Sequence, residues 1–165
     1  DFENTQAIID IRSASSWYLS STPTGNINST GYFSEGFLSN DLSYGFNRAK
    51  LAWYVIDPLF QRNSSITPDH IVDDLNQQEN NYVREVLITE IFPNKDIVNG
   101  QPSRLRTFDL AFYPSERGPY NFDVTPSSYS YGINADGLLN EPSSRWGGIM
   151  REIETNDLFH NFKIY

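Results

Sequence analysis

The pattern of hydrophobic and polar positions along the chain predicts strands more often than helices. Residues 49–56 carry aromatic and aliphatic side chains at both alternating sets of positions, so we expect a central strand that is buried on both sides. Residues 106–113 alternate polar or small side chains with Phe, Leu and Phe, which predicts a half-buried strand. Shorter apolar runs at residues 6–11, 16–20 and 149–153 predict three further strands.

Two segments carry helical signals. Thr67-Pro68-Asp69 has the residues of a helix start, and it predicts a short helix over residues 68–75. Residues 82–92 place apolar side chains at mixed spacing, and we favour a strand at residues 88–92.

The remaining segments read as connections. Residues 21–40 and 115–131 are rich in Ser, Thr, Gly, Asn, Pro or Tyr and predict long loops, while residues 134–137 predict a turn. Together the elements predict a mainly β fold, a jelly-roll-like β-sandwich with long loops and one or two short helices. The length of 165 residues suits a single β-rich domain, or a fragment of one, over residues 1–165.

The amino-acid composition excludes several classes of binding partner and chemical site. The net charge is −9 and no cluster of Lys and Arg stands out in the sequence, so we expect no nucleic acid partner. The longest apolar run, residues 51–56, is far shorter than the ~20 residues of a membrane-spanning helix, so we expect no direct membrane insertion by this segment. The absence of cysteine excludes disulfides, a thiolate nucleophile and sulfur-ligated metals.

Residues that could carry out catalysis form no recognisable site. His70 and His160 are too far apart in sequence to argue for a metal centre, and Asp136 lacks the further ligands of a calcium loop. The chain has no Gly-x-Ser-x-Gly elbow and no Gly-rich phosphate loop. Acids for a hydrolase are present, but no spacing selects a pair among Glu85, Glu90, Asp109 and Glu116. We therefore expect a non-catalytic protein with no cofactor and no metal, and a hydrolase stays open as a third hypothesis.

Arg145-Trp146-Gly147-Gly148 is the most distinctive local motif. Two glycines beside a tryptophan allow a second chain segment to approach closely while the indole packs or stacks. We expect Arg145 to lie over an aromatic face. Five side chains are candidates for interaction or packing, namely Trp53, Arg117, Tyr120, Arg145 and Trp146.

The aromatic content of 15% also supports a different function. Carbohydrate-binding β-sandwich modules stack exposed aromatic rings on sugars, although aromatic residues in strands more often belong to a core. The candidates for such a platform are Trp17, Tyr18, Tyr54 and Trp146.

A series of segments, in order along most of the chain, resembles the SprA/Sov family, the outer-membrane translocon of the type IX secretion system in Bacteroidetes. The matching segments are NTQAIIDIR at 4–12, NRAKLAWY at 47–54, TPDH at 67–70, YVREV at 82–86, EIFPNKD at 90–96, LAFYP at 110–114, ERGPYN at 116–121 and RWGGIMR at 145–151.

This resemblance implies a function in protein secretion and gliding motility. Proteins of the family form a very wide outer-membrane β-barrel through which folded cargo leaves the periplasm. The implied partners are other secretion-system subunits, secreted cargo proteins and the remainder of the chain's own barrel. The implied location is the cell envelope, in association with the outer membrane.

The beginning of the chain suggests that it is part of something larger. Asp1 is not an initiator residue, and no apolar stretch after a basic start resembles a signal peptide. We expect a soluble domain attached to the barrel, working as a structural and interaction module without catalytic residues.

Overall fold

The computed structural model describes residues 11–24 and 33–152. These residues are mostly strand and loop with a few short helices, which confirms the mainly β prediction at that level. The strands are β1 (Tyr18–Leu19), β2 (Ala49–Tyr54), β3 (Val86–Leu87), β4 (Arg104–Leu105), β5 (Asp109–Arg117) and β6 (Ile149–Met150). The α-helices are α1 (Leu75–Gln78) and α2 (Ile88–Ile91), and the 3-10 helices are η2 (Ala14–Ser16), η3 (Ser34–Phe37), η4 (Leu42–Gly45), η5 (Pro58–Phe60) and η6 (Pro142–Ser144).

The chain divides into two compact units. Unit 1 comprises residues 1–16, 53–109 and 152–165, and unit 2 comprises residues 17–52 and 110–151. Within the described part of the chain the strands pair two by two, as β1 with β6, β2 with β5 and β3 with β4. This division does not test whether residues 1–165 form a single β-rich domain, so that statement remains a prediction.

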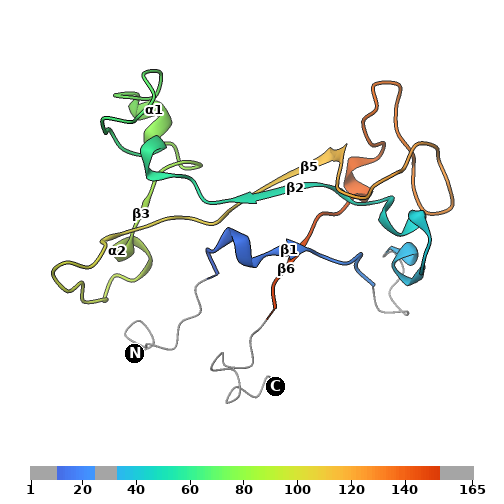
Figure 1. The fold of residues 1–165 in the computed structure, drawn as a ribbon, viewed down its shortest axis with the longest axis horizontal. Coiled ribbons are helices and arrows are strands. Elements are labelled where there is room, and N and C mark those ends of the chain that lie inside the picture. The colour runs from blue at the N-terminus through green and yellow to red at the C-terminus, as the bar shows by residue number, and fades with distance from the viewer. Residues whose placement is uncertain (1–10, 25–32, 153–165) are drawn as a thin grey trace, which may run out of the picture. The chain divides into compact units, whose positions relative to one another are not determined.

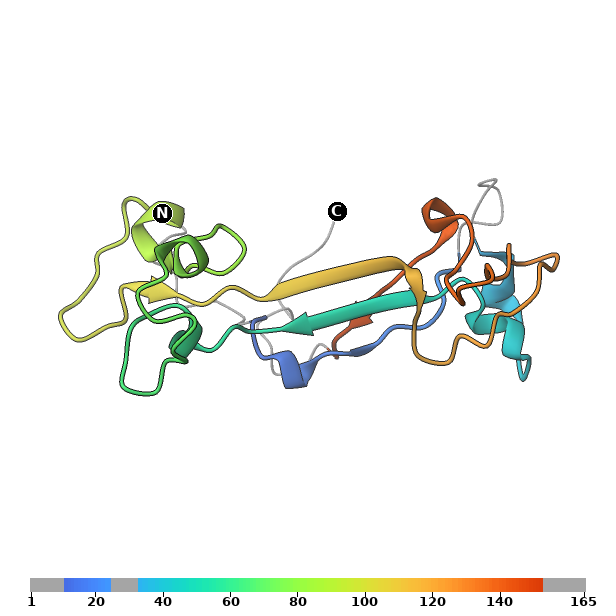
Figure 2. The same ribbon diagram turned by 90° about the horizontal axis from the view of Figure 1, so that it is seen from above.

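Strand β2 and strand β5 are the two longest strands and lie side by side in opposite directions (Figures 1 and 2). Pro114 falls inside β5, and because proline has no N–H to donate, it is tolerated only where a strand edge has no ladder partner. A strand with a single neighbour provides such an edge.

The strand predicted at residues 49–56 is present, but its predicted environment is wrong. Within residues 11–24 and 33–152, strand β2 has one strand partner, and its residues run from buried at Ala49 to exposed at Lys50 and Tyr54. Alternating aromatic side chains predicted two buried faces, whereas Tyr54 is 43% exposed. Aromatic content at both faces therefore did not imply a central strand.

The other strand predictions fared unevenly. Strands β1 and β6 occupy part of residues 16–20 and 149–153, and they pair antiparallel with Tyr18 opposite Met150. Strand β5 begins three residues later than predicted and continues to Arg117, into residues assigned to a loop. The strand predicted at residues 6–11 falls almost wholly outside the described residues.

The helix predicted over residues 68–75 is wrong. The amides of Ile71 and Val72 both donate to the carbonyl oxygen of Pro68, which closes one turn. Asp73 then adopts a left-handed backbone (φ 61°), and its amide donates to Asn63 Oδ1 at 3.0 Å. The left-handed residue stops the turn from continuing as a helix, and α1 starts two residues later.

The strand favoured at residues 88–92 is also wrong, because residues 88–91 form α2 and Phe92 follows its end. The carboxylate of Glu90 accepts the amide of Leu87 at 2.9 Å, which satisfies one of the free N–H groups at a helix start. The predicted turn at residues 134–137 is confirmed. There Asn134 Oδ1 accepts the amides of Asp136 and Leu138, and Gly137 supplies the left-handed backbone (φ 81°).

Candidate functional site

The Arg145–Gly148 motif lies beside the start of β2 in unit 2. The amide of Trp146 donates to the carbonyl oxygen of Asn47 at 3.1 Å, and the amide of Ala49 donates to the carbonyl oxygen of Trp146 at 2.7 Å. These two bonds form a parallel bridge between Arg48 and Trp146. The motif therefore joins two chain segments that are about a hundred residues apart in sequence.

Arg145 is fully buried and uses its guanidinium as a multiple donor. Its Nε donates to the carbonyl oxygen of Asn140 at 2.9 Å, and one terminal nitrogen donates to the carbonyl oxygen of Gly132 at 3.0 Å. The other terminal nitrogen lies within 3.2 Å of three acceptors, on Phe46, Asn47 and Asp123. A planar guanidinium can serve so many acceptors because its five N–H groups have a fixed geometry.

Asp123 is the charge partner of Arg145. The Arg145 nitrogen and Asp123 Oδ2 are 3.1 Å apart, and both side chains have zero exposure. The second oxygen, Oδ1, accepts the hydroxyl of Ser130 at 2.8 Å, and the Asp123 amide donates to Asn121 Oδ1 at 2.8 Å. A buried ion pair needs such extra hydrogen bonds to offset the cost of removing both charges from water.

Asn47 extends the network to a second acid. Its Nδ2 donates to Glu35 Oε1 at 2.7 Å and to the carbonyl oxygen of Tyr129 at 2.6 Å. Burial raises the pKa of Glu35 above its usual 4.5, although the hydrogen bond from Asn47 and the charge of Arg145 both act to lower it. We call this set the buried polar cluster, and its side chains are Glu35, Asn47, Asn121, Asp123, Ser130 and Arg145.

The aromatic contact of the motif differs from the one expected. The cation over the Trp146 ring is Arg48, whose guanidinium carbon lies 5.0 Å from the ring centroid, and Arg145 serves the ion pair instead. The ring of Phe33 lies 6.0 Å from that of Trp146 at a tilt of 54°. Arg48 also donates to the carbonyl oxygen of Pro119 at 3.0 Å. Trp146 is thus 7% exposed and is a packing residue.

The two glycines do allow close approach. A methyl group added at Gly147 would lie 2.9 Å from Phe112 Cε2 and 3.0 Å from Leu51 Cβ, which is closer than side-chain carbons pack. One added at Gly148 would lie 2.5 Å from the Ser20 hydroxyl oxygen. The segment therefore fits against β2, β5 and the residue after β1 because it has no side chain at these positions.

The remaining predicted residues lie in different settings. Arg117 ends β5, is exposed, and makes a long bond of 3.4 Å to the carbonyl oxygen of Asp123. Tyr120 has a left-handed backbone (φ 61°) and a side chain that is 72% exposed. Trp53 belongs to unit 1, where its Nε1 donates to the carbonyl oxygen of Ala14 at 3.1 Å. The structure therefore connects Arg145, Trp146 and Arg117 to one cluster, whereas Tyr120 is an exposed residue next to Asn121 in sequence.

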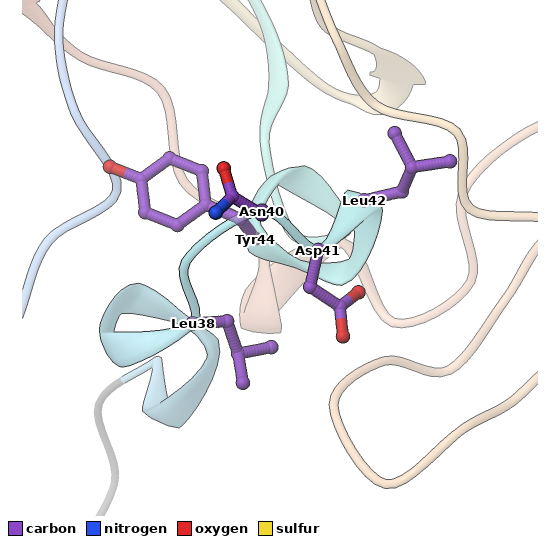
Figure 3. A pocket seen from close by; sticks show the side chains of 5 residues that line it. All are labelled: Leu38, Asn40, Asp41, Leu42 and Tyr44. Atoms are coloured by element: carbon purple, nitrogen blue, oxygen red, sulfur yellow. The ribbon is translucent and has the colours of Figure 1, made fainter.

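A hollow of about 590 Å³ lies over η3 and η4 in unit 2 (Figure 3). The labelled side chains around it point in different directions and do not converge on a common centre. Two of its polar groups already have partners: the Tyr44 hydroxyl accepts the amide of Thr22 at 2.9 Å, and Asp41 accepts the amide of Ser43 at 2.8 Å. The arrangement is a surface depression, not a built site.

The described residues hold no group of three or more His, Asp or Glu side chains placed to bind a metal. In the same residues, no helix has the length and apolar character required to cross a bilayer. Of the rings proposed as a sugar platform, Trp146 is buried, whereas Tyr18 is 57% and Tyr54 is 43% exposed.

Sequence reasoning missed the acids and amides of the buried polar cluster. Asp123 and Glu35 stand in loop-like stretches with no spacing that relates them to Arg145, which is 22 residues from Asp123. Asn47, Asn121 and Arg145 lie inside segments that support the family resemblance, but nothing in those segments indicates that the three side chains meet.

No family model matches this sequence, and no curated protein matches it either.

Proposed function

We propose that the chain is a non-catalytic structural and interaction domain of an outer-membrane translocon of the type IX secretion system, similar to SprA/Sov. The proposal starts from the ordered series of matching segments. The structural observation that carries it is a surface rich in large apolar side chains around an interior held by polar bonds. Such a distribution suits a module whose surface is covered by other protein.

The distribution is uneven in a measurable way. Among the described residues, twenty-three large hydrophobic side chains are exposed and four hydrophobic residues are buried. Eleven buried residues are polar or charged, including both members of the Arg145–Asp123 pair. Soluble domains normally bury most of their large apolar residues, so this surface calls for partners.

Strand β5 is the best-defined part of that surface. Leu110 is 57% exposed and Phe112 is 44% exposed, and side chains two residues apart in a strand point to the same face. The β-sandwich expected from the sequence belongs to the same proposal, because added strands would complete the two-stranded sheets. The partners are other secretion-system subunits, secreted cargo and the remainder of the chain's own barrel, at the outer membrane of the cell envelope.

The parent gene gives the first test. A translocon requires a long barrel-forming region in the same gene, and its absence would overturn the proposal. The second test replaces Leu110, the more exposed of the two side chains, by Ser in the chromosomal gene. We expect cargo secretion to fall while the amount of the protein in the envelope stays unchanged.

A matched control is Leu42→Ser, which removes an apolar side chain of similar exposure from η4 of the same unit. Unchanged secretion in the β5 variant, or an equal loss in the control, would remove β5 as the contact surface.

Carbohydrate binding stays the alternative because Tyr18 and Tyr54 are exposed. A polysaccharide pull-down that succeeds with the chain and fails after Tyr18→Ala or Tyr54→Ala would favour it over the secretion proposal.

A further inference from the structure

Unit 1 contains a pocket whose charge is opposite to that of the whole chain. Its volume is about 770 Å³, within the usual range of ligand pockets, and β4 contributes to its wall together with the residues on either side of β3. Five cations and one carboxylate line it: Arg12, Arg62, Lys95, Arg104, Arg106 and Glu85. We call it the basic pocket.

The pocket holds a large share of the few cations in an acidic chain. The chain has twelve Lys and Arg and a net charge of −9, yet five of those cations line a single pocket. They come from separate stretches of sequence, which is why no basic run revealed them. Clustered cations in a concave wall concentrate positive potential and attract anions.

Glu85 shows which anion these arginines fit. Arg62 Nε donates to Glu85 Oε2 at 2.6 Å while a terminal nitrogen of the same guanidinium bonds Oε1, so the pair is bidentate. Arg104 lies 3.5 Å from Oε2. The hydrogen bonds from Arg62 hold the pKa of Glu85 below its usual 4.5, so this carboxylate is charged at neutral pH.

The arginines retain accessible donors. Glu85 has a side-chain exposure of only 4%, whereas Arg62 and Arg104 are 51% and 53% exposed. Leaving Arg12 aside, four described cations line the pocket beside one carboxylate, so the described lining carries a surplus of positive charge. Arginine forks of this kind bind carboxylates with defined geometry.

The wall is not purely charged. Val55, Ile88 and Leu105 also line the pocket, with Pro58 and Pro102. A simple inorganic anion would leave these apolar groups unused, whereas a peptide that alternates acidic and apolar residues would contact both kinds of wall. A long nucleic acid would be repelled by the overall charge of −9.

We propose that the basic pocket of unit 1 binds an acidic peptide segment of a partner protein, with carboxylates on the arginines and apolar side chains against the aliphatic wall. This deepens the proposed interaction function and rests on it for the existence of a partner. The binding chemistry itself rests only on the pocket.

The test titrates the full chain into a fluorescein-labelled ten-residue peptide of alternating Glu and Leu, and measures fluorescence anisotropy at low salt. We expect saturable binding that weakens as salt rises, because exposed charges are screened beyond about 10 Å at 0.1 M salt. Arg106→Glu should weaken binding about tenfold, since it reverses a wall charge. Lys95→Glu should act in the same direction and gives a second, independent variant.

The matched control is Arg117→Glu, which makes the same charge change on an exposed residue of unit 2. Binding by this variant should stay within about twofold of the unchanged chain. Circular dichroism of each variant establishes that it is folded.

Three results would overturn the proposal: no saturable binding of the peptide, an equal loss in the Arg117→Glu control, or tighter binding of pyrophosphate or single-stranded DNA than of the peptide. If the β5 variant secreted cargo normally, that outcome would count against β5 as the contact surface of the translocon. It would not affect the conclusion that the basic pocket binds an acidic peptide. Loss of peptide binding alone would leave the translocon proposal standing.

Discussion

At the scale of residues, the main feature is the ion pair of Arg145 and Asp123, which is buried away from water. Arg145 and Asp123 both have zero side-chain exposure, and Arg145 bonds to groups on four other residues as well. The acceptors come from both of the sequence segments that make up unit 2, residues 17–52 and 110–151. Arg145 therefore fixes the mutual positions of loops that have little regular structure of their own.

Removing the cation should destabilise unit 2 strongly. Arg145→Met is expected to lower the free energy of unfolding by about 3–5 kcal/mol, because it leaves the buried Asp123 carboxylate without its charge partner. Urea denaturation followed by tryptophan fluorescence measures this change. The double variant Arg145→Met with Asp123→Asn should recover part of the loss, since no lone charge stays buried.

Arg117→Met is the control for that experiment. Arg117 is exposed, and its one described bond is long, at 3.4 Å. The control should change the free energy of unfolding by no more than about 0.5 kcal/mol. A loss below about 1 kcal/mol for Arg145→Met would contradict a central function for the ion pair.

Glu35 gives a pH-dependent prediction at the same scale. Its pKa is raised in the folded protein, mainly by burial, so the folded state binds this proton more tightly than the unfolded chain. The stabilising contribution is complete below the unfolded pKa near 4.5 and is lost as the pH rises through the folded pKa. Glu35→Gln keeps an oxygen for Asn47 to bond and removes the titration.

We therefore expect Glu35→Gln to be more stable than the unchanged chain at pH 7, with the difference shrinking towards pH 4. The measurement is the free energy of unfolding of both proteins at the two pH values. A difference that does not vary with pH would show that Glu35 has no raised pKa.

At the scale of elements, the sequence predicted correctly those elements that are stabilised by neighbouring residues. It failed for those that depend on contacts with distant parts of the chain. The turn at residues 134–137 was predictable because Asn134 and Gly137 stabilise it locally. Strand β2 was predictable from its alternation, but its exposure depends on how many strands lie beside it, and alternation does not specify that number. The helix expected after Thr67 failed because a long-range bond from Asp73 to Asn63 holds a left-handed residue.

The candidate site shows the same division. The Arg145–Gly148 motif was identifiable because a tryptophan followed by two glycines is a local signal. The basic pocket and the buried polar cluster were not, since their members come from loops that only the folded chain brings together. The charges of Arg62 and Arg104 meet through Glu85, at sequence separations that have no periodic pattern.

Helix α2 offers a test at this scale. Glu90 accepts the Leu87 amide at 2.9 Å and also pairs with Arg84 at 3.0 Å. Glu90→Ala removes the side chain that caps the helix start and should cost about 1 kcal/mol. Hydrogen exchange at the Leu87 amide should quicken, whereas Thr89→Ala, an exposed position of the same helix, should leave it unchanged. Equal exchange in both variants would show that the Glu90 bond does not hold the helix.

At the scale of the whole molecule, two properties act against each other. The exposed apolar side chains favour association, and the net charge of −9 opposes it through repulsion between copies. In the translocon proposal, partner surfaces cover the apolar groups and the charge keeps uncovered chains apart. The balance should therefore be adjustable by pH and by salt.

The isoelectric point near 4.5 sets the condition under which repulsion disappears. Dynamic light scattering should detect single chains at pH 7 and low salt, and larger particles as the pH approaches 4.5. At pH 7, raising the salt to 1 M shortens the screening length to about 3 Å and should have the same direction of effect. If apolar contact drives the association, the Leu110→Ser variant should form fewer particles under both conditions, while Leu42→Ser should not. If particles form equally in the unchanged chain, the β5 variant and Leu42→Ser, loss of charge repulsion alone explains the association. Strand β5 would then not be the surface through which copies of the chain associate.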